Sequence, residues 1–262
     1  MQSSPIHSPP FARRWLAPLA LAIAAFQLPS PVLAQNPGWH SVLEANASTF
    51  FGATSQTLTA LAADVSHGGE GFTADAHFKF RYGEAEDAKK VKSVNARGVS
   101  VSTSVDVAPH GRFSPFVMFT GETSLEARIE SRFSGGAGAK WMFAKSSTGS
   151  ASVSLAVLGE RTAALADTLT SRIKGVARYS WRVKMDQRLD DKVSVSHATF
   201  YAPIVNSPEQ FTVTSTTVGS YALSKPVALT VTFTDNYDSQ AELRGAPGNN
   251  NGSLLFGVRG SF

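Results

Sequence analysis

The chain has 262 residues, no cysteine and a formal net charge of +4 at pH 7. Without cysteine there is no disulfide framework, no thiolate metal site and no cysteine nucleophile. A charge excess this small does not indicate the basic face of a nucleic-acid-binding domain, so we expect no nucleic-acid partner.

The N-terminus has the features of a secretory signal peptide. Arg13 and Arg14 precede an apolar stretch over 15–26, and small residues lead up to Ala34. The apolar stretch is shorter than the roughly 20 residues that a membrane-spanning helix needs. We therefore predict a signal peptide over 1–34, cleavage after Ala34 and a mature domain over 35–262. The alternatives are a retained anchor and twin-arginine export.

From Ser41 onward, segments rich in Val, Phe, Ser and Thr alternate apolar with polar residues and are bounded by Gly, Pro, Asn or Asp. This period of two predicts strands with two unlike faces. Twelve strands are expected, at 41–51, 57–66, 71–82, 93–107, 113–122, 131–143, 150–160, 172–185, 192–202, 210–222, 227–237 and 252–262. The even number is typical of bacterial single-chain barrels. The predicted fold class is all-β, an antiparallel transmembrane β-barrel of the outer membrane, in contact with its lipid.

The predicted connections alternate in length. Those after even-numbered strands are short, whereas those after odd-numbered strands are mostly longer, and the longest covers 239–251. The connection at 52–56 is the exception. Alternation of short turns with longer external loops is typical of outer-membrane barrels.

Each strand divides its side chains between a lipid face and a lumen face. In the third strand, Phe78 and Phe80 share one face and Lys79 and Arg81 the other. A basic residue on the lipid face near the midplane costs about 2–4 kcal/mol, so clustered basic residues must face the lumen. The expected lumen cluster comprises Lys79, Arg81, Arg132, Lys140, Lys174, Arg178, Arg182, Lys184 and Arg259. Fewer acids share the lumen, among them Glu44, Asp75, Glu122 and Glu160.

Two interpretations of the lumen stay open. Rings of Arg and Lys favour anions in pores, so the cluster is typical of an anion-favouring passage. Alternatively, the charges pair across a side-chain-filled interior that conducts nothing. A barrel of twelve strands lies between filled and open types, so its size does not decide between them.

The last strand ends on an aromatic residue. Phe256, Val258 and Phe262 share one face, with Arg259 on the other. Such an ending is similar to the signal that the outer-membrane barrel-assembly machinery reads, and we expect that machinery as a partner. In a soluble protein, the alternative, Phe262 would lie on a free strand edge that is prone to aggregation.

Short motifs along the mature chain resemble the salt-induced outer-membrane protein family, a Gram-negative family without an assigned activity. They are Trp39, the run from Phe133 to Trp141, Leu158 to Arg161, Tyr237 to Ser239, and Gly257 to Phe262. The resemblance implies an outer-membrane barrel and supplies no catalytic residues. Gly52-Ala53-Thr54 departs from the pattern. The glycines after Phe133 fit close backbone approach or a bend in the barrel wall.

Catalytic and metal-binding patterns are weak. His197 with Ser194, Ser196 and Asn206 is the one candidate for a lipid hydrolase, and Ser171 with Lys174 has a Ser-x-x-Lys spacing on a strand instead of a helix. We expect no enzyme activity, no metal and no cofactor. A small passive pore is the first hypothesis. A closed barrel with an envelope-stress, structural or binding role through its external loops is the second, and a lipid hydrolase is the last. The oligomeric state and the solute stay open.

Overall fold

The structure is a computed structural model, and it describes residues 38–50, 55–87, 89–165 and 173–262. The expected signal peptide and its cleavage after Ala34 lie outside these residues. No helix in the described part of the chain is long and apolar enough to cross a membrane.

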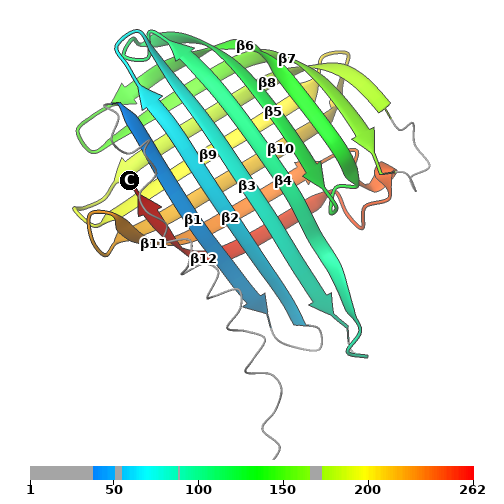
Figure 1. The fold of residues 1–262 in the computed structure, drawn as a ribbon. Coiled ribbons are helices and arrows are strands. Elements are labelled where there is room, and N and C mark those ends of the chain that lie inside the picture. Colours follow the sequence, from blue (N-terminus) through cyan, green and yellow to red (C-terminus); the bar gives the residue numbers. More distant parts are fainter. Residues whose placement is uncertain (1–37, 51–54, 88, 166–172) are drawn as a thin grey trace, which may run out of the picture.

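The described residues form twelve antiparallel strands, each paired with the next, and β12 returns to β1 to close a barrel (Figure 1). The predicted antiparallel barrel of twelve strands is therefore confirmed. The strands are β1 (Trp39–Phe50), β2 (Ser55–Gly68), β3 (Phe72–Glu86), β4 (Lys92–Val107), β5 (Phe113–Ser124), β6 (Ile129–Lys145), β7 (Gly149–Ala164), β8 (Ile173–Arg188), β9 (Val193–Ile204), β10 (Ser207–Ala222), β11 (Val227–Asp238) and β12 (Asn250–Ser261). A short 3-10 helix, η2 (Glu242–Arg244), lies between β11 and β12.

Side-chain exposure follows the alternation in the sequence. Phe78, Trp181 and Phe233 point outward and are 44%, 49% and 48% exposed. Inward neighbours of two of them are shielded, since Ser180 beside Trp181 and Thr232 beside Phe233 are each only 6% exposed. The apolar side chains therefore form an outer belt around a polar lumen, as lipid on one side and water on the other require.

The two ends of the barrel differ. One end, which we call the terminal end, carries the start of β1, the end of β12 and the turns 69–71, 108–112, 146–148, 189–192 and 223–226. We call the opposite end the distal end. There, 239–249 is a long connection, but the turn between β9 and β10 covers only 205–206. The expected long connection there was wrong, because β10 begins at Ser207 and continues through an irregularity before Phe211.

Glycines mark two places where neighbouring strands approach closely. A Cβ atom at Gly136 or Gly138 would collide with the carbonyl oxygens of Val157 or Leu155 on β7. At Gly257 on β12 it would collide with Asn46 on β1. The close backbone approach predicted for the glycines of β6 is confirmed, and a second close approach lies at the β1–β12 seam.

Two clusters of apolar side chains lie in the lumen near these close approaches. Leu58, Ala60, Ala96 and Leu255 form one buried cluster near the seam. Phe116, Ala156 and Leu158, with Met118, form the other beside β6. The lumen is therefore narrowed by packed side chains along two parts of the wall.

The seam that closes the barrel has the shortest register. β1 pairs with β12 over Val42–Ala47, whereas it pairs with β2 along its whole length, Trp39–Phe50. The C-terminal Phe262 extends the seam, since its backbone N–H donates to the Ser41 carbonyl at 2.8 Å. Inside the barrel, Arg259 of β12 contacts Glu44 of β1 at 2.6 Å.

Candidate functional site: a constriction in the lumen

Arg132 is the centre of an ion-pair network near the distal end. It lies inward on β6, close to the start of that strand. Its Nη1 is 2.9 Å from Glu122 Oε1, its Nη2 is 2.7 Å from Asp238 Oδ2, and its Nε is 3.8 Å from Glu160 Oε1. Four strands separate β6 from β11 around the wall in one direction and six in the other. The pair with Asp238 therefore crosses the lumen.

The connection between β11 and β12 is part of the same network. Arg244 of η2 lies 2.6 Å from Asp238 Oδ2, and its Nε donates to the carbonyl oxygen of Ala127 at 2.9 Å. Asp238 also accepts a hydrogen bond from the backbone N–H of Gln240. These contacts hold the connection against the turn between β5 and β6. We call Glu122, Arg132, Glu160, Asp238 and Arg244 the constriction network.

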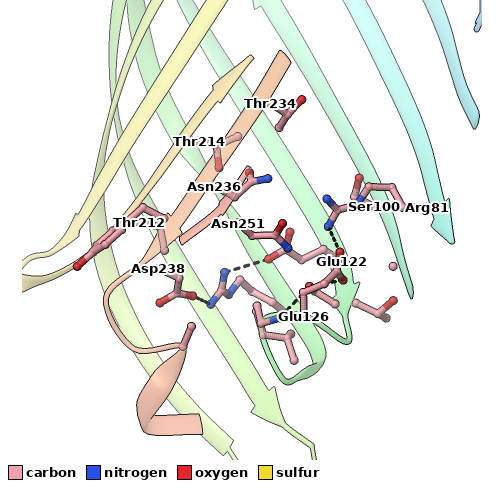
Figure 2. A pocket seen from close by; sticks show the side chains of 18 of the residues that line it. Arg81, Ser100, Glu122, Glu126, Thr212, Thr214, Thr234, Asn236, Asp238 and Asn251 are labelled. Atoms are coloured by element: carbon pink, nitrogen blue, oxygen red, sulfur yellow. Dashed lines mark hydrogen bonds and ion pairs between the residues drawn. The ribbon is translucent and has the colours of Figure 1, made fainter. Parts of the chain in front are cut away.

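The constriction network separates two cavities. The first has a volume of about 260 Å³ and lies among β3, β4, β5, β10, β11 and β12. Figure 2 shows this cavity with Arg81, Glu122, Glu126 and Asp238 around it and threonine and asparagine side chains along one wall. The second, of about 420 Å³, lies beside β7, β8 and β9. Arg132 lines both cavities, so it divides the space at this level of the lumen.

Most of the predicted lumen cations have acidic partners. Arg81 lies 3.0 Å from Glu126, Arg178 lies 2.9 Å from Glu160, and Lys140 pairs with Asp106. Each such pair has almost no net charge, so neither its cation nor its carboxylate attracts a passing ion strongly.

Two further lysines lie in more open positions. Lys174, near the distal end, donates to Gln210 at 2.8 Å. Lys184, near the terminal end, is half-exposed and lies 3.4 Å from Asp186.

Lys79 and Arg182, like Lys174, differ from the paired lumen cations. Among the described residues, no carboxylate oxygen lies within 4.0 Å of any of these three. The Arg182 guanidinium lies between the rings of Phe116 and Phe200, 5.7 Å and 5.5 Å from their centroids, and its Nε donates to Ser154. Their positive charge is therefore less compensated than that of Arg132 or Arg178.

The sequence did not identify several members of this site. Asp106 lies on an inward position of β4, so alternation alone could have found it. Glu126 lies in a turn, and Asp238 and Arg244 lie at a strand end and in η2. Periodicity carries no signal at such positions.

The candidate hydrolase residues are not brought together. His197 faces outward on β9, whereas Ser194 and Ser196 occupy inward positions. Ser171 lies outside the described residues. No group of three or more His, Asp or Glu side chains in the described chain is arranged to hold a metal ion.

The proposed assembly residues share the outward face of β12. Phe256 is 57% exposed and Phe262 38% exposed, and Val258 lies between them on the same face.

The sequence matches the family described as "Protein of unknown function, DUF481" over residues 43–247. The chain belongs to this family. The expected membership in a family of outer-membrane barrels is thereby supported, although the description of the DUF481 family does not mention salt. No curated protein matches the DUF481 chain.

Solved structures with a similar fold are outer-membrane barrels. The NanC porin is 10% identical with a TM-score of 0.50, covering 84% of this chain and 98% of the porin. The translocator domain of the autotransporter NalP from Neisseria meningitidis is 13% identical with a TM-score of 0.49, covering 95% and 98%. The KdgM porin in complex with oligogalacturonate is 13% identical with a TM-score of 0.42, covering 85% and 99%. The likeness to NanC shows the fold alone: this DUF481 chain has an outer-membrane β-barrel fold.

Proposed function

We propose that the protein is a narrow passive channel of the outer membrane, with its terminal end toward the periplasm and its distal end outside. The observation that carries the proposal is the position of Arg132, which bridges the lumen to Asp238 between cavities of about 260 Å³ and 420 Å³. A solute that enters from outside meets this bridge first. The constriction network therefore limits passage to small solutes, and the chain acts without catalysis.

The preference of the channel for ions depends on the charges that lack a close partner. Paired cations contribute little, because a carboxylate lies beside each of them. Lys79, Arg182 and Lys174 have no such carboxylate among the described residues. Basic side chains in a pore wall favour anions. The proposed anion preference is therefore weak and depends on these three residues instead of on the whole basic cluster.

A closed barrel is the second candidate, and one observation favours it. Two apolar clusters, around Leu255 and around Phe116, occupy part of the lumen. A lumen filled to this extent could carry no current, and the function would then lie in the distal connections, beginning with 239–249.

Conductance across a planar lipid bilayer tests the choice. The mature protein is used after a shift in gel mobility on heating has demonstrated its fold. Small discrete steps with a weak anion preference are expected for the channel. Folded protein that gives no steps at any voltage would contradict the channel and favour the closed barrel.

A further inference from the structure

A patch of polar side chains interrupts the apolar outer belt on three adjacent strands. His197 is the register partner of Met185, which points outward and is 43% exposed. Thr217 is the register partner of Phe233, which is also outward. Five polar side chains share this outward face, and we call them the polar patch: His197, Thr199, Ser215, Thr217 and Asp235.

The polar patch lies within the belt and not at its rim. On β9 the neighbouring outward positions are Val195 and Tyr201, and on β10 they are Val213 and Gly219, followed by Tyr221. Polar and ionisable groups that face hydrocarbon are destabilising, and ionisable residues inside a membrane usually have a partner or a function. Other outward stretches, such as Leu229 to Phe233, are apolar.

The hydrogen bonds inside the polar patch leave at least one donor without an acceptor. His197 Nδ1 and Nε2 each lie 2.9 Å from a threonine Oγ1, of Thr217 and Thr199 respectively, and Thr199 lies 3.2 Å from Ser215 Oγ. A neutral imidazole and three hydroxyls supply four donors, whereas three contacts use at most three. Lipid chains offer no acceptor for the remaining donor.

Asp235 adds an acceptor on the same face. It is the register partner of Ser215. Among the described residues, its carboxylate forms no hydrogen bond or ion pair. The polar patch therefore has an excess of donors on β9 and β10 and an unused acceptor on β11.

We propose that the polar patch is the contact surface between two copies of this chain in the membrane. Both copies insert in the same orientation, so the two-fold axis that relates them must run along the membrane normal. An axis beside β10 places β9 of one copy against β11 of the other. The imidazole and hydroxyls around His197 then face the partner copy's carboxylate at the position of Asp235. The small side chains Ser215, Thr217 and Gly219 allow the walls to approach closely.

The absence of cysteine permits a direct test by disulfide cross-linking. Ser215→Cys places one thiol in the polar patch, and Val157→Cys places one on the outward face of β7, where Val157 is 54% exposed. In oxidised membranes from expressing cells, we expect at least about tenfold more covalent dimer from S215C than from V157C. Equal yields, or a cross-link of S215C to a different protein, would overturn the proposal.

A second variant tests the chemistry of the contact. His197→Leu combined with Thr217→Val makes the belt apolar, which lipid tolerates, so the heat-induced gel shift should persist. The association constant of the dimer in detergent should fall about tenfold, because several hydrogen bonds across the contact are lost. Unchanged association of the folded variant would contradict the proposal. If the variant did not fold, the comparison of S215C with V157C would still decide.

Discussion

Arg132 on β6 and Asp238 on β11 form an ion pair of 2.7 Å across the lumen, and the same Asp238 oxygen lies 2.6 Å from Arg244. The Asp238 carboxylate therefore binds both the opposite wall, through Arg132, and the connection between β11 and β12, through Arg244. Removing one partner from a network of this kind leaves the other charges without compensation.

Arg132→Ala is expected to enlarge the passage. The substitution removes the bridge and leaves Glu122, Glu160 and Asp238 without their shared cation, so they repel one another. Breaking a buried pair costs about 3–5 kcal/mol, which should lower stability as well. Single-channel conductance should rise and selectivity should move toward cations. The control is Lys184→Ala. Lys184 is half-exposed near the terminal end, so its loss should leave the single-channel conductance step unchanged. Equal conductance of R132A and the wild type would contradict the constriction.

Arg182→Gln is expected to reduce the anion preference. The guanidinium lies between two phenyl rings with no carboxylate partner among the described residues, so its loss removes net positive charge from the lumen. Reversal potentials in a salt gradient measure the change. The matched control replaces both members of a neutral pair, Glu44→Gln with Arg259→Gln, and should leave the reversal potential near that of the wild type. A larger shift in the control than in R182Q would argue against this assignment.

Gly138→Ala is expected to impair folding. The added Cβ would collide with the Leu155 carbonyl oxygen and the Ala156 side chain, where β6 and β7 approach closely. Overpacking of this kind costs about 1–3 kcal/mol. Urea titration of the folded form, recognised by its heat-induced gel shift, measures the loss of stability. Gly159→Ala on β7, where the nearest atom to an added Cβ is 4.0 Å away, should be close to neutral. Similar unfolding midpoints for G138A and G159A would mean that the close approach of β6 and β7 tolerates a side chain.

Deletion of Phe262 is expected to reduce assembly in cells more than refolding in detergent. The residue supplies backbone hydrogen bonds to Ser41 and an outward ring at the end of β12. If the ring is read by the assembly machinery, Phe262→Ala should lower the amount in the outer membrane although its backbone contacts persist. Phe262→Tyr should assemble normally. Equal amounts of the deletion variant, Phe262→Ala and Phe262→Tyr in the outer membrane would contradict a role of the aromatic C-terminal residue in assembly.

The alternation of side chains was sufficient to predict the strands and their faces. Phe78 and Lys79 show why, since lipid and water select opposite residues at every second position. Contacts across the lumen were beyond this reasoning, because alternation assigns a face and not a partner. Arg132 and Asp238 lie on strands that are not neighbours, and their approach depends on the register of every strand between them. Arg244 lies in a connection, where no periodicity exists.

The length of the strands determines where the constriction network lies relative to the lipid. A strand needs about 9–11 residues to cross the hydrocarbon, and β6 has 17. Outward charged residues, Glu84 on β3 and Arg161 on β7, occur near the distal ends of their strands. The hydrocarbon layer therefore surrounds the terminal part of the barrel, and the distal part projects into the headgroup region. In the proposed orientation, water-soluble reagents that cannot cross the membrane should thus reach the Arg132 bridge from outside, before they reach the part of the lumen inside the bilayer.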